Sequence, residues 1–113
     1  MPIQPYLKVI CPNTAGFVGY AKLTVLKQNG DFMGETRVDC PSPQNTDVKY
    51  IQITGSGEPK NWRIELNLIN NNTRNTKNQS FEGRYDMSQP NTTTGNASII
   101  LDEVTFTAGT GWR

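Results

Sequence analysis

The sequence predicts an all-β protein folded as an antiparallel two-sheet β-sandwich of about seven strands, either Ig-like or jelly-roll-like. A small β-barrel is the alternative. Composition is the first reason: the 113 residues include 12 Asn, 13 Thr, 10 Gly and 7 Pro. Thr favours strands because its branched Cβ suits a pleated surface, whereas Asn, Gly and Pro favour turns. The second reason is a series of short apolar–polar alternations with a period of two, separated by turn residues.

The clearest local signal is a hairpin in the first third of the chain. A strand from Tyr6 to Ile10 comes first, and a second alternation covers residues 21–25. It is followed by Asn29-Gly30, a dipeptide that favours a two-residue type I′ turn because both residues tolerate positive φ. This turn predicts the pairs Leu26–Met33, Val25–Gly34, Leu23–Thr36 and Ala21–Val38.

The remaining strands are predicted at Val48–Thr54, Trp62–Leu68, Phe81–Met87 and Ala97–Thr107. Two polar stretches between them, Asn70–Ser80 and Gln89–Asn96, offer no core residues and are expected to form exposed loops. The last strand changes phase, because apolar residues have odd numbers before Asp102-Glu103 and even numbers after it. A β-bulge at this dipeptide would reconcile the two halves. We expect residues 1–113 to form a single domain, with 108–113 as a flexible tail.

Cys11 and Cys40 occur in similar contexts, each at the end of an apparent strand and followed by proline. If those strand ends are neighbours, a disulfide would join two loops at one pole of the domain. Two separate buried thiols are the alternative, because spacing alone does not establish the geometry. Two cysteines without any histidine make a poor zinc site, so we expect no metal and no cofactor.

Several function classes are disfavoured. The formal charge of +1 gives no electrostatic footprint for nucleic acid or an anionic membrane. The longest apolar run, Ile99-Ile100-Leu101, is far shorter than the roughly 20 residues of a membrane span. The chain lacks histidine, and the adjacent Asp102 and Glu103 would point to opposite faces of a strand. We therefore expect no enzyme. An extracellular or cell-surface location is slightly favoured.

Aromatic residues exceed what a small core must bury. Trp62 is in phase with Ile64 and Leu66, which indicates a core position. Trp112 lies outside any alternation, beside Arg113, and an exposed indole near a cation suits a ligand platform. The other expectation for Trp112 is a terminal side chain that caps the sandwich or is disordered. The remaining spare aromatic residues are Tyr6, Tyr20, Tyr50 and Tyr85.

The predicted function is a non-catalytic, lectin- or adhesin-like module that binds a neutral polar ligand, with carbohydrate preferred, or a cell-surface protein. Amides and hydroxyls supply the hydrogen bonds that sugars need, and aromatic rings stack on them. The predicted ligand-binding residues are Asn72, Arg74, Asn75, Asn91, Thr93, Asn96, Trp112 and Arg113. One alternative is an assembly subunit of a virion, fibre or surface layer, which implies a homo-oligomer. The other is a proteinaceous inhibitor that acts through its loops.

Overall fold

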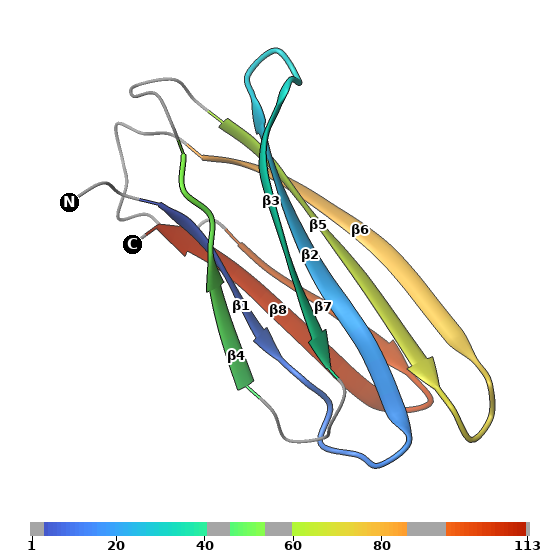
Figure 1. Cartoon of the computed structure of the whole chain (residues 1–113). Helices are drawn as coiled ribbons and strands as arrows, with labels where there is room; N and C mark the ends of the chain where they lie inside the picture. The colour runs from blue at the N-terminus through green and yellow to red at the C-terminus, as the bar shows by residue number, and fades with distance from the viewer. Residues whose placement is uncertain (1–3, 41–45, 54–59, 86–94, 113) are drawn as a thin grey trace.

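Within the part of the chain that the structure describes, eight strands form two antiparallel four-stranded sheets that face each other (Figure 1). The structure is a computed structural model that describes residues 4–40, 46–53, 60–85 and 95–112. The strands are β1 (Pro5–Ile10), β2 (Phe17–Lys27), β3 (Phe32–Cys40), β4 (Thr46–Tyr50), β5 (Lys60–Asn70), β6 (Thr76–Tyr85), β7 (Gly95–Leu101) and β8 (Val104–Trp112). The sandwich prediction is confirmed, with eight strands instead of seven and two sheets instead of one closed barrel. The choice between Ig-like and jelly-roll-like connections stays a prediction.

The strand order is β4-β1-β8-β7 in the first sheet and β3-β2-β5-β6 in the second. Each sheet turns one set of alternating side chains toward the other sheet. In β5 the alternation continues over the whole strand, and Trp62, Ile64 and Leu66 are buried as predicted. From the first sheet, Leu7 and Phe106 meet them with no exposed surface. The core is therefore a layer of apolar side chains between the two sheets.

The two ends of the sandwich differ in what they hold (Figure 1). The β1–β2 loop and the β5–β6 and β7–β8 turns lie at one end, here called the disulfide end. The β2–β3 hairpin, the start of β1 and the end of β8 lie at the other, here called the hairpin end.

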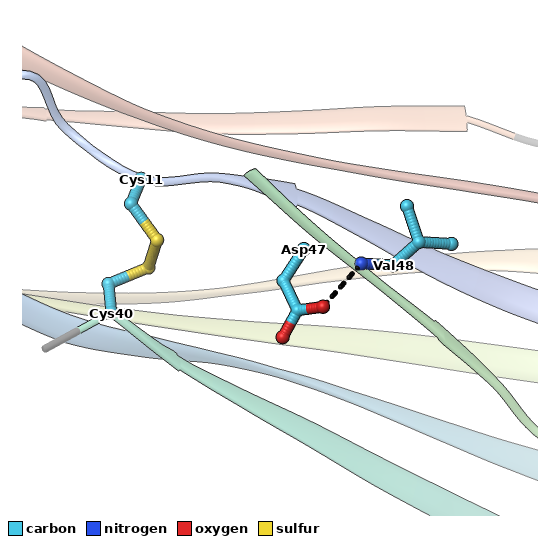
Figure 2. The surroundings of a disulfide bond; sticks show 4 residues. All are labelled: Cys11, Cys40, Asp47 and Val48. Carbon is cyan, nitrogen blue, oxygen red and sulfur yellow. Dashed lines mark hydrogen bonds between the residues drawn. A yellow bond between two sulfur atoms is a disulfide. The ribbon is translucent and has the colours of Figure 1, made fainter. Parts of the chain in front are cut away.

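A disulfide joins Cys11 to Cys40, which confirms that expectation. The two Cα atoms are 5.6 Å apart, and both side chains are buried. Cys11 follows β1 in the first sheet, whereas Cys40 ends β3 in the second, so the bond links the two sheets. Figure 2 shows it beside the start of β4, where the Asp47 carboxylate accepts a hydrogen bond from the Val48 N–H (2.9 Å).

The β2–β3 hairpin exists, but its turn is not the predicted two-residue type I′. Of Asn29 and Gly30, only Gly30 has positive φ, at 94°. The Gly30 N–H donates to the Lys27 carbonyl and the Lys27 N–H donates to the Asp31 carbonyl, which makes a three-residue loop with glycine in its left-handed position. An irregularity between Val25 and Leu26 then restores the predicted register. The pairs Val25–Gly34, Leu23–Thr36 and Ala21–Val38 are confirmed, whereas Leu26 pairs with Phe32 instead of Met33.

The predicted bulge at Asp102-Glu103 is wrong, because the chain reverses there. Leu101 pairs with Val104, and φ is positive at both Asp102 (49°) and Glu103 (67°), as a two-residue type I′ turn requires. The change of phase thus separates two strands, β7 and β8. Residues 108–112, expected in a flexible tail, instead belong to β8 and pair with β1. Arg113 lies outside the described residues.

The polar stretch Asn70–Ser80 is exposed beyond Asn70, as predicted, but only part of it is a loop. The turn covers residues 71–75, and β6 begins at Thr76. β6 is an edge strand with a solvated start, so it needs no apolar residues there. Sequence alternation alone therefore missed the first half of this strand.

Removing the disulfide should lower stability substantially. Replacing both cysteines by Ser should reduce the free energy of unfolding by about 3–4 kcal/mol, since the bridged residues are 29 apart and the unfolded chain gains loop entropy. Urea unfolding of the double variant and of the wild type measures the difference. Thiol labelling before and after reduction is the control. An unchanged urea midpoint would contradict the stabilising role.

Gly30 should resist substitution for a backbone reason alone. A Cβ at this position meets nothing within 4 Å, so Gly30→Val tests only the cost of positive φ, about 1–2 kcal/mol for a branched residue. Gly30→Asn should cost less, because Asn tolerates the left-handed region. Equal stability of the two variants in thermal unfolding would argue against this loop geometry.

Candidate functional site

The predicted ligand-binding residues do not come together in the structure. Asn72, Arg74 and Asn75 lie in the β5–β6 turn at the disulfide end. Asn96 near the start of β7 and the backbone of Trp112 at the end of β8 lie toward the hairpin end. Asn91, Thr93, Arg113 and the side chain of Trp112 lie outside the described residues. The described members of the set are therefore split between opposite ends of the sandwich, and a role of each in binding stays a prediction.

At the disulfide end the polar turn serves the fold. The Asp102 carboxylate accepts hydrogen bonds from Asn70 Nδ2 (2.9 Å), Thr73 Oγ1 (3.0 Å) and Asn75 Nδ2 (3.1 Å). Asn70 Oδ1 in turn accepts from the Asn72 N–H (3.0 Å). The hydrogen bond from Asn70, followed by those from Thr73 and Asn75, lowers the pKa of Asp102 below its usual value. This carboxylate joins the β7–β8 turn of one sheet to the β5–β6 turn of the other.

The outer faces of the two sheets differ in charge. On the first sheet, Lys8 is the one charged side chain among the described residues that alternation points outward. Tyr6 and Tyr50 pair across β1 and β4 with ring centroids 5.8 Å apart, and Ile10 and Val48 are exposed nearby. This face is largely uncharged and partly apolar.

The outer face of the second sheet carries a network of ion pairs. Lys22 on β2 approaches Glu35 on β3 (3.8 Å) and Glu65 on β5 (3.4 Å). Arg63 approaches the other oxygen of Glu65 (3.2 Å). Cations and anions thus neutralise each other on this face.

Tyr20 occupies the hollow part of that face. A depression of about 400 Å³ beside it is lined by Val18, Ile69, Asn67, Arg37 and Asp39. The apolar Val18 and Ile69 are register partners on adjacent strands and supply a hydrophobic base. Cys40 also lines this depression, so the disulfide anchors one of its sides.

Arg37 is held in a defined position in this depression. Its guanidinium carbon lies 3.9 Å from the centroid of the Tyr20 ring, and its Nε donates to Asp39 Oδ1 (2.9 Å). The two terminal amino groups of Arg37 have no hydrogen-bond partner within the described part of the chain. Asp39 Oδ2 likewise accepts no hydrogen bond from the described residues. The pair therefore presents donors and an acceptor side by side.

A second depression, of about 290 Å³, lies on the β6 side of Tyr20. Asn78 and Ser80 from β6 and Glu65 from β5 contribute to its lining. Asn67 Nδ2 donates to Asn78 Oδ1 across the two strands, which orients both amides. Tyr20 is thus flanked by two depressions lined with amides, a hydroxyl and paired charges. Such a site can hydrogen-bond a polar ligand, and the part of the Tyr20 ring that Arg37 does not cover can pack against the apolar side of the ligand.

Sequence reasoning noted Tyr20 as a spare aromatic residue but did not connect it with its neighbours. Alternation along each strand predicts that Tyr20, Asn67 and Asn78 point outward. Their adjacency depends on the order β2-β5-β6 and on the pairs Tyr20–Asn67 and Asn67–Asn78. The alternation of β6 could have shown that Asn78 and Ser80 share one face. This alternation is not visible in the sequence, because the start of β6 has no apolar residues.

The described residues contain no group of three or more His, Cys, Asp or Glu side chains placed to hold a metal ion. No helix in the described part of the chain is long and apolar enough to cross a membrane. The sequence matches no protein-family model, and no curated protein or solved structure matches it either.

The Asp102 contacts should make stability depend on pH. Because the folded-state pKa of Asp102 lies below its ordinary value of 3.8, this carboxylate stabilises the fold fully above that value, and the stabilisation is lost as the pH falls through the folded-state pKa. Asp102→Asn keeps a residue that tolerates positive φ but removes the charge. It should lower the urea midpoint at neutral pH, and the gap to the wild type should narrow in acid.

Glu103→Gln is the matched control, because it removes a carboxylate from the same turn that makes none of these hydrogen bonds. A gap for Asp102→Asn that is independent of pH, or equal to that for Glu103→Gln, would contradict the role assigned to the charge.

Proposed function

We propose that this protein is a non-catalytic binding module that recognises a neutral carbohydrate on the outer face of the second sheet, with Tyr20 at the centre of the site. One observation carries this proposal: the half-buried Tyr20 ring stands between two depressions whose polar groups are amides, a hydroxyl and an Arg–Asp pair. In this proposal the main binding site is the sheet face and not the loops that the sequence predicted.

The chemistry of the lining fits sugars. A pyranose ring presents an apolar face that stacks on an aromatic side chain, and hydroxyls that both donate and accept hydrogen bonds. Arg37 offers donors, Asp39 offers an acceptor, and Asn67 and Asn78 offer both. A strongly charged ligand would gain little, because the cations and anions of this face already lie beside each other.

The disulfide is consistent with an extracellular or cell-surface setting, since such bonds persist in oxidising compartments. Glycans exposed on cells or in the extracellular matrix are present in that setting. This supports the ligand class without identifying the sugar.

Assembly remains a second candidate function, supported by the first sheet. Ile10, Val48 and Tyr50 are exposed close together on its outer face, with 47%, 37% and 43% of their surfaces accessible. Apolar residues gathered on one face favour contact with another protein surface. Light scattering after size-exclusion chromatography separates the two functions: a monomer that binds glycans supports the module, and concentration-dependent growth without glycan binding supports assembly.

Tyr20→Ala should weaken glycan binding at least about tenfold, because a central aromatic anchor contributes more than 1.4 kcal/mol in typical interfaces. A glycan array selects the ligand, and isothermal titration calorimetry measures the affinity. Tyr50→Ala, on the opposite outer face, is the matched control and should leave the affinity unchanged. Equal affinity of Tyr20→Ala and wild type, with both folded, would place the site elsewhere.

A further inference from the structure

We infer that the ligand is a linear glycan lying along β5, not a single terminal sugar. This inference rests on the proposed function and adds the length and direction of the ligand. It comes from a third depression on the same outer face, beyond the two that flank Tyr20.

The third depression has a volume of about 320 Å³. Its lining includes Leu26 from β2, Asn61, Trp62 and Arg63 from β5, and Glu82 from β6. Asn61 and Ile69 mark the two ends of the hollowed region on β5, and strand geometry places them about 26 Å apart. This distance is several times the width of one pyranose ring. A monosaccharide could therefore fill one depression only, whereas an extended oligosaccharide could reach all three.

The third depression is polar on the side that faces solvent. Asn61 and Arg63 on β5 and Glu82 on β6 offer an amide, a guanidinium and a carboxylate, and Leu26 on β2 adds an apolar side. Trp62 has the opposite parity on β5, so its indole lies in the core, 5% exposed, beneath Gly83 and beside Tyr85. The depression therefore offers a ligand hydrogen-bonding groups and one aliphatic contact.

The segment between the depressions is compatible with a neutral chain. Glu65 lies between Lys22 and Arg63, so a sugar crossing this point meets charges that already have partners. Ser80 on β6, which pairs with Glu65, is small and leaves room above the sheet. A polyanionic glycan would instead meet Glu65 and Glu82 without any excess of cations. The paired charges and the room above Ser80 therefore favour a neutral, linear polysaccharide.

The test measures binding of oligosaccharides of increasing length to the whole protein. Cello-, manno- and xylo-oligosaccharides of one to six units are titrated by calorimetry. For the series that binds, affinity should rise at least about tenfold from one unit to four and then level off, because added contacts stop when all three depressions are filled. Equal affinity for one unit and for four would overturn the inference while leaving the proposed function intact.

Two variants show where the glycan lies on the protein. Glu82→Ala should weaken binding of the four-unit ligand several-fold and leave the two-unit ligand within about twofold, whereas Tyr20→Ala should weaken both. Ser98→Ala, exposed on the first sheet, is the control. A Glu82→Ala protein that binds all lengths like wild type would remove the third depression from the site. If folded wild type binds neither the three oligosaccharide series nor any glycan on the array, the proposed function itself is overturned.

Discussion

The pairing of β2 with β5 determines most of what this molecule presents to solvent. The two strands are in register from the pair Phe17–Asn70 to the pair Lys27–Lys60. This register determines which face of the sheet each β5 side chain lies on. A slip of one residue would exchange the two faces completely. The parity that buries Trp62 and Leu66 therefore also points Asn61 and Asn67 outward. The core and the proposed site are two results of one register.

The two sheets are held together at the disulfide end by contacts of different chemistry. The Cys11–Cys40 bond connects β1 with β3 covalently, and the hydrogen bonds to Asp102 connect the β7–β8 turn with the β5–β6 turn. The disulfide stabilises the fold by lowering the conformational entropy of the unfolded chain, whereas the hydrogen bonds to Asp102 stabilise the folded state directly. Together they fix the end of the sheet where Tyr20, Arg37 and Asp39 lie.

Sequence patterns predicted the elements whose side chains alternate and failed where they do not. The fold class, the core position of Trp62 and most of the β2–β3 register follow from local spacing. The similar contexts of Cys11 and Cys40 pointed to a disulfide, but the bond itself is established by the structure. The β7–β8 turn was missed because Asp102-Glu103 is an unusual pair for two positive φ angles, and its stability comes from distant donors on Asn70 and Thr73. The start of β6 was missed because an exposed edge needs no apolar residue.

The candidate site was harder to predict than the fold. Each of its residues is ordinary within its own strand, and only the sheet order places Tyr20 beside Asn67 and Asn78. The polar loops were predicted to bind the ligand because they concentrate Asn and Thr. In the structure Asn70, Thr73 and Asn75 direct their polar groups to Asp102. Polar composition alone does not distinguish a binding loop from a structural one.

The ion pairs around Lys22 have a consequence for the medium in which the protein works. Salt weakens attraction between a charged surface and a charged ligand, because mobile ions screen it over about 10 Å at moderate concentration. A face whose cations and anions already neutralise each other, and a ligand without charge, leave little for those ions to screen. Recognition on this sheet would therefore hold in dilute and in saline surroundings alike.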